Sequence, residues 1–350
     1  MGRDPWMARV RRTAGYLDLD RRHDHFRGVG LADAARAVGP MKTFGEWFQS
    51  LPPNMRGAIF VVLGTAFFVL TDIAVKFAGD RIHPAQMAIF RYGLGFVLLM
   101  PLFIRTGPER LRSKRLKLHF FRAIVASLGQ AGIFYAVIHL PLADATAMNF
   151  TRPLFLTVLA IFVLKEIVGL HRWSATLVGF AGVIVMMRPF GGEIDIAWFV
   201  ALFTAFLFAS GLIIIRVLAR DDPPGTILFW YHIFGALIFA GPAAYVWVNP
   251  TPTEWLLLCL IATFTAIGMN FFVRGFSVGE SSLMGTMEYI RLVFAVVAGY
   301  VIFTEIPDIW TGVGATIIVG ATLYIARYEA RRETRKETPP DDRQATSGDK

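Results

Sequence analysis

Cysteine and charge are both scarce in this sequence of 350 residues. A single cysteine cannot form an internal disulfide, and only 17% of the residues are charged, where soluble proteins average about 25%. Cys259 lies in an apolar run, so we expect a buried and unreactive thiol. Phosphate-binding loops of the form GxxxxGK[ST], clusters of metal ligands and nucleophile elbows are also missing. These absences argue against an enzyme, against a bound metal or cofactor, and against ATP hydrolysis by this chain alone.

Apolar residues are abundant instead. They make up 55% of the chain, and phenylalanine alone occurs 31 times. We find ten apolar segments of about 18–24 residues, each long enough to cross the ~30 Å hydrocarbon core of a bilayer as a helix. The segments lie near 57–77, 85–104, 119–139, 145–164, 171–188, 196–217, 225–248, 255–274, 282–303 and 309–327. We therefore predict an all-α polytopic membrane protein with ten transmembrane helices, embedded in a lipid bilayer.

The positive charge is distributed as a membrane topology requires. With a cytoplasmic N-terminus, only Arg81 and Arg188 of the 35 Lys and Arg residues fall on the far side of the membrane. Five others lie inside the segments, and all the rest lie on the cytoplasmic side, which positively charged loops prefer. The bias predicts a multi-pass inner-membrane protein with both termini in the cytoplasm. It also explains the net charge of +9 without a nucleic-acid partner.

Polar extensions flank the apolar region at both ends. Residues 1–56 are rich in arginine and lack the apolar core of a secretory signal, so we predict a disordered cytoplasmic extension or an over-long gene start. Residues 328–350 are charged and contain Pro339-Pro340, which predicts a disordered cytoplasmic tail.

The two halves of the apolar region resemble each other at a constant offset of 139 residues. The matches fall in one ungapped register and pair Pro84 with Pro223, Tyr92 with Tyr231, Arg152 with Arg291, and Glu166 with Glu305. The halves 57–188 and 196–327 each hold five segments, so the second half enters the membrane from the opposite side. We predict two inverted five-helix repeats, an architecture typical of alternating-access transporters with a substrate site near the membrane midplane.

One recurring element resembles a known family. In each half, a fourth segment ends in a glutamate just before a fifth segment that contains tryptophan and several glycines. These residues are Glu166, Trp173, Gly179 and Gly182 in one half, and Glu305, Trp310, Gly312, Gly314 and Gly320 in the other. From about 56 to 328 the chain resembles the EamA type of the drug/metabolite transporter superfamily. Residues 289–292, Tyr-Ile-Arg-Leu, resemble the subgroup often labelled S-adenosylmethionine or riboflavin uptake carriers. The resemblance implies a central cavity lined by helices 1–4 and 6–9, with helices 5 and 10 peripheral.

Charged residues inside the fourth and ninth segments are the first candidates for a substrate site. A charge at the bilayer centre costs about 2.5–3.5 kcal/mol, so Arg152 and Arg291 should face protein or water. Asn149 and Glu288 each precede one of these arginines by three residues and therefore share its helix face. We expect an arginine to bind an anionic or planar substrate group, with Glu288 holding Arg291 or taking a proton. The alternative is a Glu288–Arg291 salt bridge that only braces one helix.

Further candidates lie on other segments. Asp72 is a candidate for ion or proton coupling, or else a structural partner of Lys76 or Arg91. His232 is either a second coupling residue or a hydrogen-bonded core histidine. Aromatic residues that stack on planar ligands, and polar groups that could bond a substrate or another helix, complete the expected substrate site. They are Tyr289, Arg91, Tyr92, Trp230, Tyr231, Gln130 and Asn270. Glu166 and Glu305, at segment ends, are expected to anchor loops.

Together these features predict a secondary transporter for a small polar or zwitterionic metabolite. It would work by alternating access across the inner membrane, coupled to protons or to exchange, with a homodimer possible. The alternative is a membrane protein that does not transport, either an enzyme or a lipid-handling partner subunit. Three prolines are candidate bending points: Pro153 beside Arg152, Pro101 in the second segment and Pro242 in the seventh. Pro153 has Leu292 as its counterpart, so any opening that it causes would be confined to one half.

Overall fold

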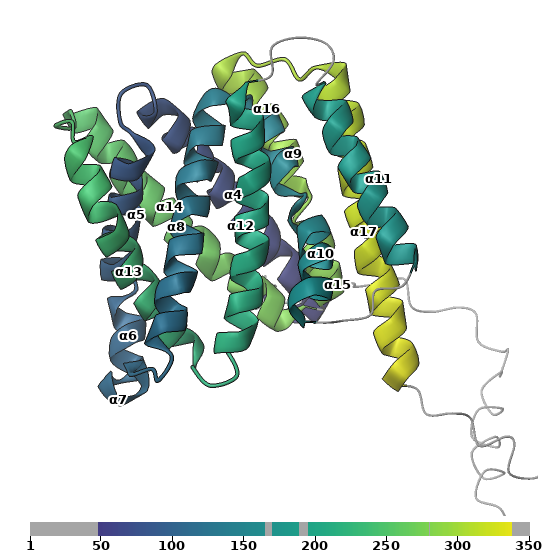
Figure 1. The fold of residues 1–350 in the computed structure, drawn as a ribbon, viewed down its shortest axis with the longest axis horizontal. Helices are drawn as coiled ribbons and strands as arrows, with labels where there is room; N and C mark the ends of the chain where they lie inside the picture. Colours follow the sequence, from purple (N-terminus) through teal and green to yellow (C-terminus); the bar gives the residue numbers. More distant parts are fainter. Residues whose placement is uncertain (1–47, 165–169, 189–194, 280, 338–350) are drawn as a thin grey trace, which may run out of the picture. The chain divides into compact units, whose positions relative to one another are not determined.

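A computed structural model describes residues 48–164, 170–188, 195–279 and 281–337, and the described elements from residue 53 onward are helices (Figure 1). Their bounds are α4 Pro53–Ala78, α5 Pro84–Leu98, α6 Met100–Thr106, α7 Pro108–Leu111, α8 Leu116–His139, α9 Leu142–Asn149, α10 Arg152–Leu164, α11 Leu170–Met187, α12 Ile196–Leu218, α13 Pro224–Tyr245, α14 Pro252–Val278, α15 Ser281–Met287, α16 Ile290–Phe303 and α17 Ile309–Glu337. The helical fold class expected from the apolar segments is confirmed for this part of the chain.

Within the described residues, 7 helical stretches are long and apolar enough to cross a membrane. The other three predicted segments are also helical. Segment 85–104 is divided into α5 and α6, segment 145–164 into α9 and α10, and segment 171–188 forms the shorter α11. The expected extension 1–56 and tail 328–350 lie largely outside the described residues, but α17 continues to Glu337 and so extends into the predicted tail.

Helix starts are encoded locally in the sequence. Proline occupies the first turn of α4, α5, α13 and α14, where its missing N–H group costs nothing. Thr251 begins α14 with a capping box, because its hydroxyl accepts from the Glu254 amide and the Glu254 carboxylate accepts from the Thr251 amide. Proline acts differently inside the two predicted bending segments. α5 gives way to α6 just before Pro101, whereas α13 runs through Pro242 to Tyr245.

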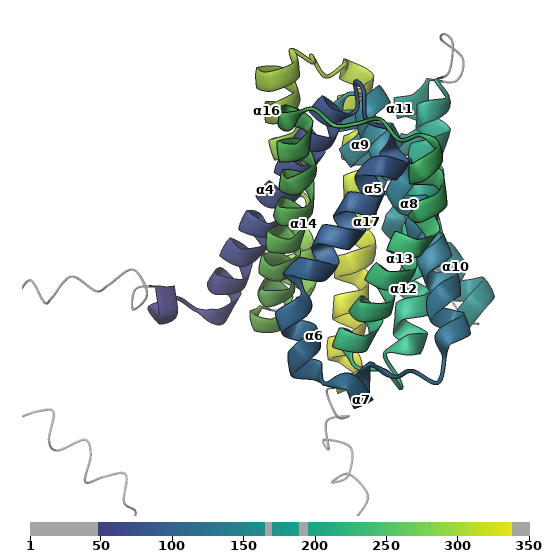
Figure 2. The ribbon, with the colours of Figure 1, turned by 90° about the vertical axis from the view of Figure 1, so that its left-hand side faces the viewer.

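Helices from the two halves of the chain pack against each other in pairs. α4 lies along α14, α8 along α12 and α5 along α13, while α11 and α17 lie side by side at one edge (Figures 1 and 2). Glycines bring α4 and α14 together: Gly57 faces Gly275, and Gly64 faces Gly268. A Cβ on Gly64 would lie 2.9 Å from the Gly268 carbonyl oxygen, which leaves no room for any side chain. We call these four glycines the glycine seam.

Two helices are interrupted at matching places. α9 ends at Asn149 and α10 begins at Arg152, while α15 ends at Met287 and α16 begins at Ile290. Across each break, amides bond to carbonyls three residues back, as Thr151 does to Met148 (3.1 Å) and Arg291 does to Glu288 (3.0 Å). Only the first break is followed by a proline, Pro153, so proline alone does not explain the pair. Both candidate arginines therefore stand at the start of a second half-helix.

Candidate functional site

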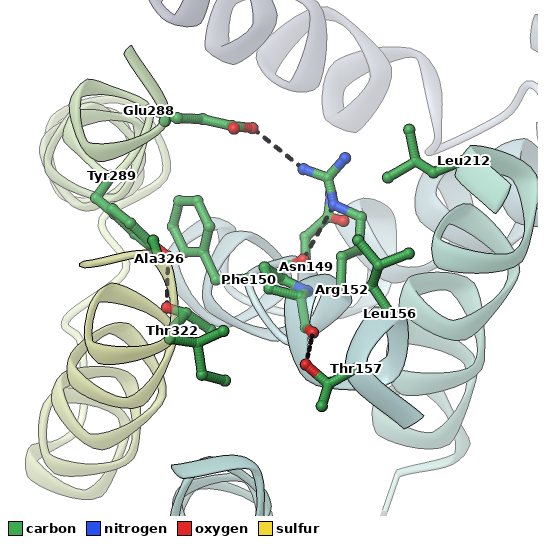
Figure 3. Close-up of a pocket in the computed structure, with 13 residues that line it drawn as sticks. Asn149, Phe150, Arg152, Leu156, Thr157, Leu212, Glu288, Tyr289, Thr322 and Ala326 are labelled. Carbon is green, nitrogen blue, oxygen red and sulfur yellow. Dashed lines mark hydrogen bonds and ion pairs between the residues drawn. The ribbon is translucent and has the colours of Figure 1, made fainter. Parts of the chain in front are cut away.

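A cavity of about 240 Å³ lies where the two interrupted helices meet (Figure 3). Asn149, Arg152, Glu288 and Tyr289, all predicted from the sequence, contribute to its lining. The Tyr289 hydroxyl donates to Thr322 of α17, and its ring lies 4.8 Å from that of Phe150, centroid to centroid. The cavity therefore combines two aromatic rings with a charged pair and an amide side chain.

Arg152 and Glu288 join the two halves of the chain across this cavity. An Arg152 guanidinium nitrogen, Nη2, donates to Glu288 Oε1 over 3.2 Å, and its Nε donates to the Asn149 carbonyl over 3.2 Å (Figure 3). Both side chains keep 26% of their surface exposed, so the pair remains open to the cavity. The Phe208 ring of α12 lies 5.9 Å from the centre of the guanidinium. The Arg152–Glu288 hydrogen bond, at 3.2 Å, is longer than the about 2.7–2.9 Å typical of a charge-assisted bond, so a ligand can compete for either partner.

Arg291 pairs with Asp72 of α4. Its Nη2 donates to Asp72 Oδ2 over 2.7 Å, and only 13% of the arginine and 10% of the aspartate side chain are exposed. The Phe68 ring lies 5.7 Å from this guanidinium. The Glu288–Arg291 salt bridge considered from the sequence is wrong, because the break in the helix turns Glu288 toward Arg152 instead. Each arginine thus finds its carboxylate on a helix of the other half.

Lys76 has a different partner from those expected. Its ammonium group donates to Glu305 and to the Leu140 carbonyl (2.8 Å), so the predicted pairing of Asp72 with Lys76 or Arg91 is wrong. Glu305 also accepts from the Leu142 amide over 2.8 Å at the start of α9. Its anchoring role, inferred from its position at a segment end, agrees with these contacts. Its counterpart Glu166 lies outside the described residues.

A second group of predicted residues meets between α5 and α13. The Tyr92 hydroxyl donates to the Tyr231 hydroxyl over 3.1 Å, and Arg91 Nη1 donates to the same oxygen over 3.3 Å. His232 lies beside them, and its Nδ1 bonds to the Leu228 carbonyl one turn earlier in its own helix (2.9 Å). His232 therefore has the hydrogen bonding of a core histidine and does not touch the carboxylates Asp72 or Glu288. We call Arg91, Tyr92 and Tyr231, with Arg122, the tyrosine cluster.

Arg122 of α8 is the member of this cluster that sequence reasoning missed. The centre of its guanidinium lies 4.8 Å from the Tyr231 ring, and its Nη1 donates to the Ile227 carbonyl over 3.2 Å. Its position was a usable signal, because it is an arginine well inside an apolar segment. The repeat hid it, since its counterpart at the constant offset is Ile261.

Three predicted substrate residues lie apart from both groups. Trp230 donates its indole N–H to the Leu111 carbonyl (2.9 Å) and stacks on Phe234, as a structural residue would. Asn270 is exposed on α14, and Gln130 is buried on α8. Cys259 is exposed on α14, so the expectation of a buried thiol is wrong: its side chain faces outward, whereas its neighbours Leu258 and Ile261 are buried.

Comparison with known proteins decides the family. The EamA-like transporter family matches residues 55–188 and 195–327, one match for each half. The chain belongs to the EamA-like transporter family. Among its curated relatives, an S-adenosylmethionine uptake transporter of Rickettsia prowazekii is 28% identical over 82% of this chain and 98% of the relative. A riboflavin transporter of Brucella anthropi is 26% identical over 77% and 98%. A pseudopaline exporter of Pseudomonas aeruginosa is 27% identical over 77% and 96%.

A solved crystal structure shares the fold of this EamA protein. It aligns with a TM-score of 0.55 at 18% identity, over 78% of this chain and 98% of that chain. With the apolar helices, these relatives make the chain a multi-pass membrane protein that transports small metabolites and is not an enzyme. The relatives include two proteins named for uptake or transport of different molecules and one named for export, so substrate and direction vary within the family.

Proposed function

We propose that this EamA protein carries a small zwitterionic metabolite of the S-adenosylmethionine type across the inner membrane by alternating access, with both termini cytoplasmic. The observation that carries the proposal is the meeting of two interrupted helices, one from each half, at the Arg152–Glu288 pair. Interrupted helices at the junction of two repeats are a recurrent construction of substrate sites in secondary transporters. The S-adenosylmethionine transporters among the relatives support the substrate class.

We further propose that ten membrane helices form two inverted repeats. Tyr92 and Tyr231 occupy equivalent positions at the constant offset, and they bond to each other. Two equivalent residues touch in this way when a local twofold axis passes between them. The equivalent pairings of α4 with α14 and of α12 with α8 fit the same axis. The homodimer considered from the sequence stays a prediction. The lining residues of the cavity named here all come from one chain.

The proposed cycle depends on competition at the Arg152–Glu288 pair. The aromatic rings of Phe150 and Tyr289 offer a stacking surface for a planar group, and Glu288 offers a carboxylate to a cationic one. A cation that takes Glu288 loosens the contact between the halves. The pair re-forms when the substrate leaves, and it stays open while another cation or a proton occupies Glu288. This exchange couples substrate occupancy to the separation of the halves, with Asp72 and Arg291 as the more buried pair.

Binding and uptake test the proposal directly. Purified protein should be stabilised against heat by S-adenosylmethionine in a concentration-dependent way, because a ligand that binds only the folded state raises its stability. In proteoliposomes, labelled S-adenosylmethionine should accumulate, and Glu288→Gln should abolish accumulation while the protein still folds. Asn270→Ala, on the exposed side of α14, is the matched control and should transport normally. Normal accumulation by Glu288→Gln would remove Glu288 from the site.

Changes in solvent access test the alternating mechanism. In a Cys259→Ser background, single cysteines are placed at Leu156 and Gly285, two residues that line the cavity from different halves of the chain. Their reaction with a membrane-impermeant maleimide should change by severalfold when S-adenosylmethionine is added. Labelling that is the same with and without substrate, at both positions, would contradict rocking of the halves about this cavity.

A further inference from the structure

The tyrosine cluster holds two positive charges that the described residues leave uncompensated. Within the described part of the chain, neither Arg91 nor Arg122 has a carboxylate at ion-pair distance. Arg122 is only 7% exposed, and its Nε has no hydrogen-bond partner there. Asp222, near the same end of α8, is held by His119 Nε2 (2.9 Å) and the Ser113 hydroxyl (2.7 Å). Burying a guanidinium without an anionic partner costs free energy of folding, so we expect an anion to offset this cost in the working protein.

Two donors of the tyrosine cluster have no acceptor among the described residues. Tyr231 accepts from both Arg91 and Tyr92, which leaves its own hydroxyl proton free to donate. Arg122 contributes an unsatisfied Nε–H, and it is pressed against the Tyr231 ring by the close packing of α8 and α13. The Arg122 Nε–H and the Tyr231 hydroxyl are thus donors without an acceptor among the described residues, and they belong to two side chains in contact with each other. A carboxylate, which accepts several hydrogen bonds and carries the compensating charge, matches this arrangement.

We infer that Arg91, Arg122 and Tyr231 form the carboxylate-binding subsite of the transporter, separate from the Arg152–Glu288 cavity. The inference rests on the proposed function, because it assigns one end of the zwitterionic substrate. Arg152 and Arg291 already have carboxylate partners, so a substrate carboxylate there must displace one. At Arg122 it displaces nothing.

Packed side chains of α8 and α12 lie between the subsite and Arg152. Gly129 lies seven residues, or ~10 Å along the helix axis, from Arg122. A Cβ on Gly129 would lie 3.0 Å from the Phe208 ring, and that ring also lies 5.9 Å from the Arg152 guanidinium. Because these side chains are packed between the two groups, a metabolite would meet them in successive states of the cycle.

A pair of ligands that differ in one group tests the inference. S-adenosylmethionine carries the carboxylate, and decarboxylated S-adenosylmethionine lacks it but keeps the adenine, the sulfonium and the amine. Affinities are measured by thermal shift and by calorimetry on the detergent-purified full chain. Wild type should prefer the carboxylate form by about tenfold or more, as expected for charge-assisted hydrogen bonds. Arg122→Gln should remove most of this preference, whereas Arg122→Lys should keep part of it.

Two control variants separate this subsite from the cavity. Arg152→Gln should change the affinity of both ligands to a similar extent, because both carry the same cationic groups, and should keep the preference. Arg115→Gln, which loses only a surface contact to Asp221, should change neither affinity. The inference is overturned if Arg122→Gln keeps the preference, or if Arg152→Gln removes it, and the proposed transport of S-adenosylmethionine would survive either result.

A second ligand pair distinguishes failure of the substrate from failure of the subsite. If wild type binds neither form of S-adenosylmethionine, methionine and methioninamide are compared in the same way. Stabilisation by methionine alone, lost in Arg122→Gln, would keep the carboxylate subsite and refute the proposed substrate. If no carboxylate ligand in either pair stabilises wild type, the subsite is refuted as well.

Discussion

The two charged regions of this transporter differ in how their arginines are partnered. Where the interrupted helices meet, Arg152 and Arg291 each have a carboxylate from the other half of the chain. In the tyrosine cluster, the contacts of Arg91 and Arg122 with described residues are to hydroxyl and carbonyl groups and to rings. The first arrangement stabilises a conformation without any ligand, and the second leaves donors for one. The contrast separates two kinds of candidate site: at Arg152 a ligand must compete with a carboxylate, whereas at Arg122 the described residues leave one hydrogen-bond donor without an acceptor.

The largest effect should come from breaking the more buried pair. Arg291→Gln leaves Asp72, 7% exposed, without its ionic partner, and we expect a loss of about 3–5 kcal/mol in the free energy of unfolding. Unfolding in mixed micelles measures it. The double variant Asp72→Asn with Arg291→Gln should recover most of the stability, because no lone charge remains. A double variant as unstable as the sum of the single ones would show that the two residues act independently.

A smaller loss should follow Glu305→Gln. The carboxylate receives both the Lys76 ammonium and the Leu142 amide, and a hydrogen bond to a charged group contributes about 1.5–3 kcal/mol. We expect a loss in that range in the same unfolding assay, with the affinity for substrate unchanged once the protein is folded. A large change in affinity with little change in stability would move Glu305 from an anchoring role into the transport machinery.

Arg122→Gln should not lower the free energy of unfolding, in contrast to the two preceding variants. Since Arg122 is buried without a carboxylate, its removal relieves an unfavourable charge, and the ligand-free protein should be as stable as wild type or slightly more stable. Comparison with Arg291→Gln in one thermal melting series would show the contrast between the two regions most directly. Destabilisation of the same size in both variants would mean that the tyrosine cluster is structural.

The smallest effect should come from the exposed pair between Arg81 and Glu254. Arg81 Nη2 donates to Glu254 Oε2 over 2.6 Å and to the Asn249 carbonyl over 2.7 Å, at the surface. Exposed ion pairs contribute little and are screened by salt. The pair is bidentate, with a second bond from Arg81 Nε to Glu254 Oε1 over 2.7 Å, so Arg81→Gln should lower the melting temperature slightly at low salt and lose most of that shift at high salt. A shift that persists at high salt would indicate that this contact bears on the buried pairs.

The sequence was sufficient to predict the helical fold and to single out Arg152 and Arg291 as buried charges. It was not sufficient to predict which carboxylates pair with them. Hydropathy alone locates the apolar segments, and the repeat identifies Arg152 and Arg291. The partner of each arginine depends on packing between helices far apart in the chain, which no local spacing encodes. Glu288 is three residues from Arg291, yet it contacts Arg152, because the helix breaks between them. Local i,i+3 reasoning fails wherever the helix is not continuous.

The breaks and the tyrosine cluster were only partly visible beforehand. Pro153 is a signal for the first break, but Leu292 stands at the same place after the second, so that break depends on tertiary contacts. The repeat identified Tyr92 and Tyr231 as candidate site residues, because they match at the constant offset. It did not identify Arg122, whose counterpart is not charged. A search confined to matching positions of a repeat therefore overlooks residues that are unique to one half, as Arg122 is.

The glycine seam has a consequence for how this gene tolerates change. Every substitution of glycine adds at least a β-carbon, and on Gly57 that atom would lie 3.0 Å from the Gly275 carbonyl oxygen. No conservative replacement therefore exists at these four positions, although none of them belongs to either charged region. In a saturation mutagenesis survey they should appear as intolerant as the substrate residues themselves. The positions most sensitive to mutation would then include a row of glycines along α4 and α14. Their sensitivity would reflect packing of the two halves against each other and not recognition of the substrate.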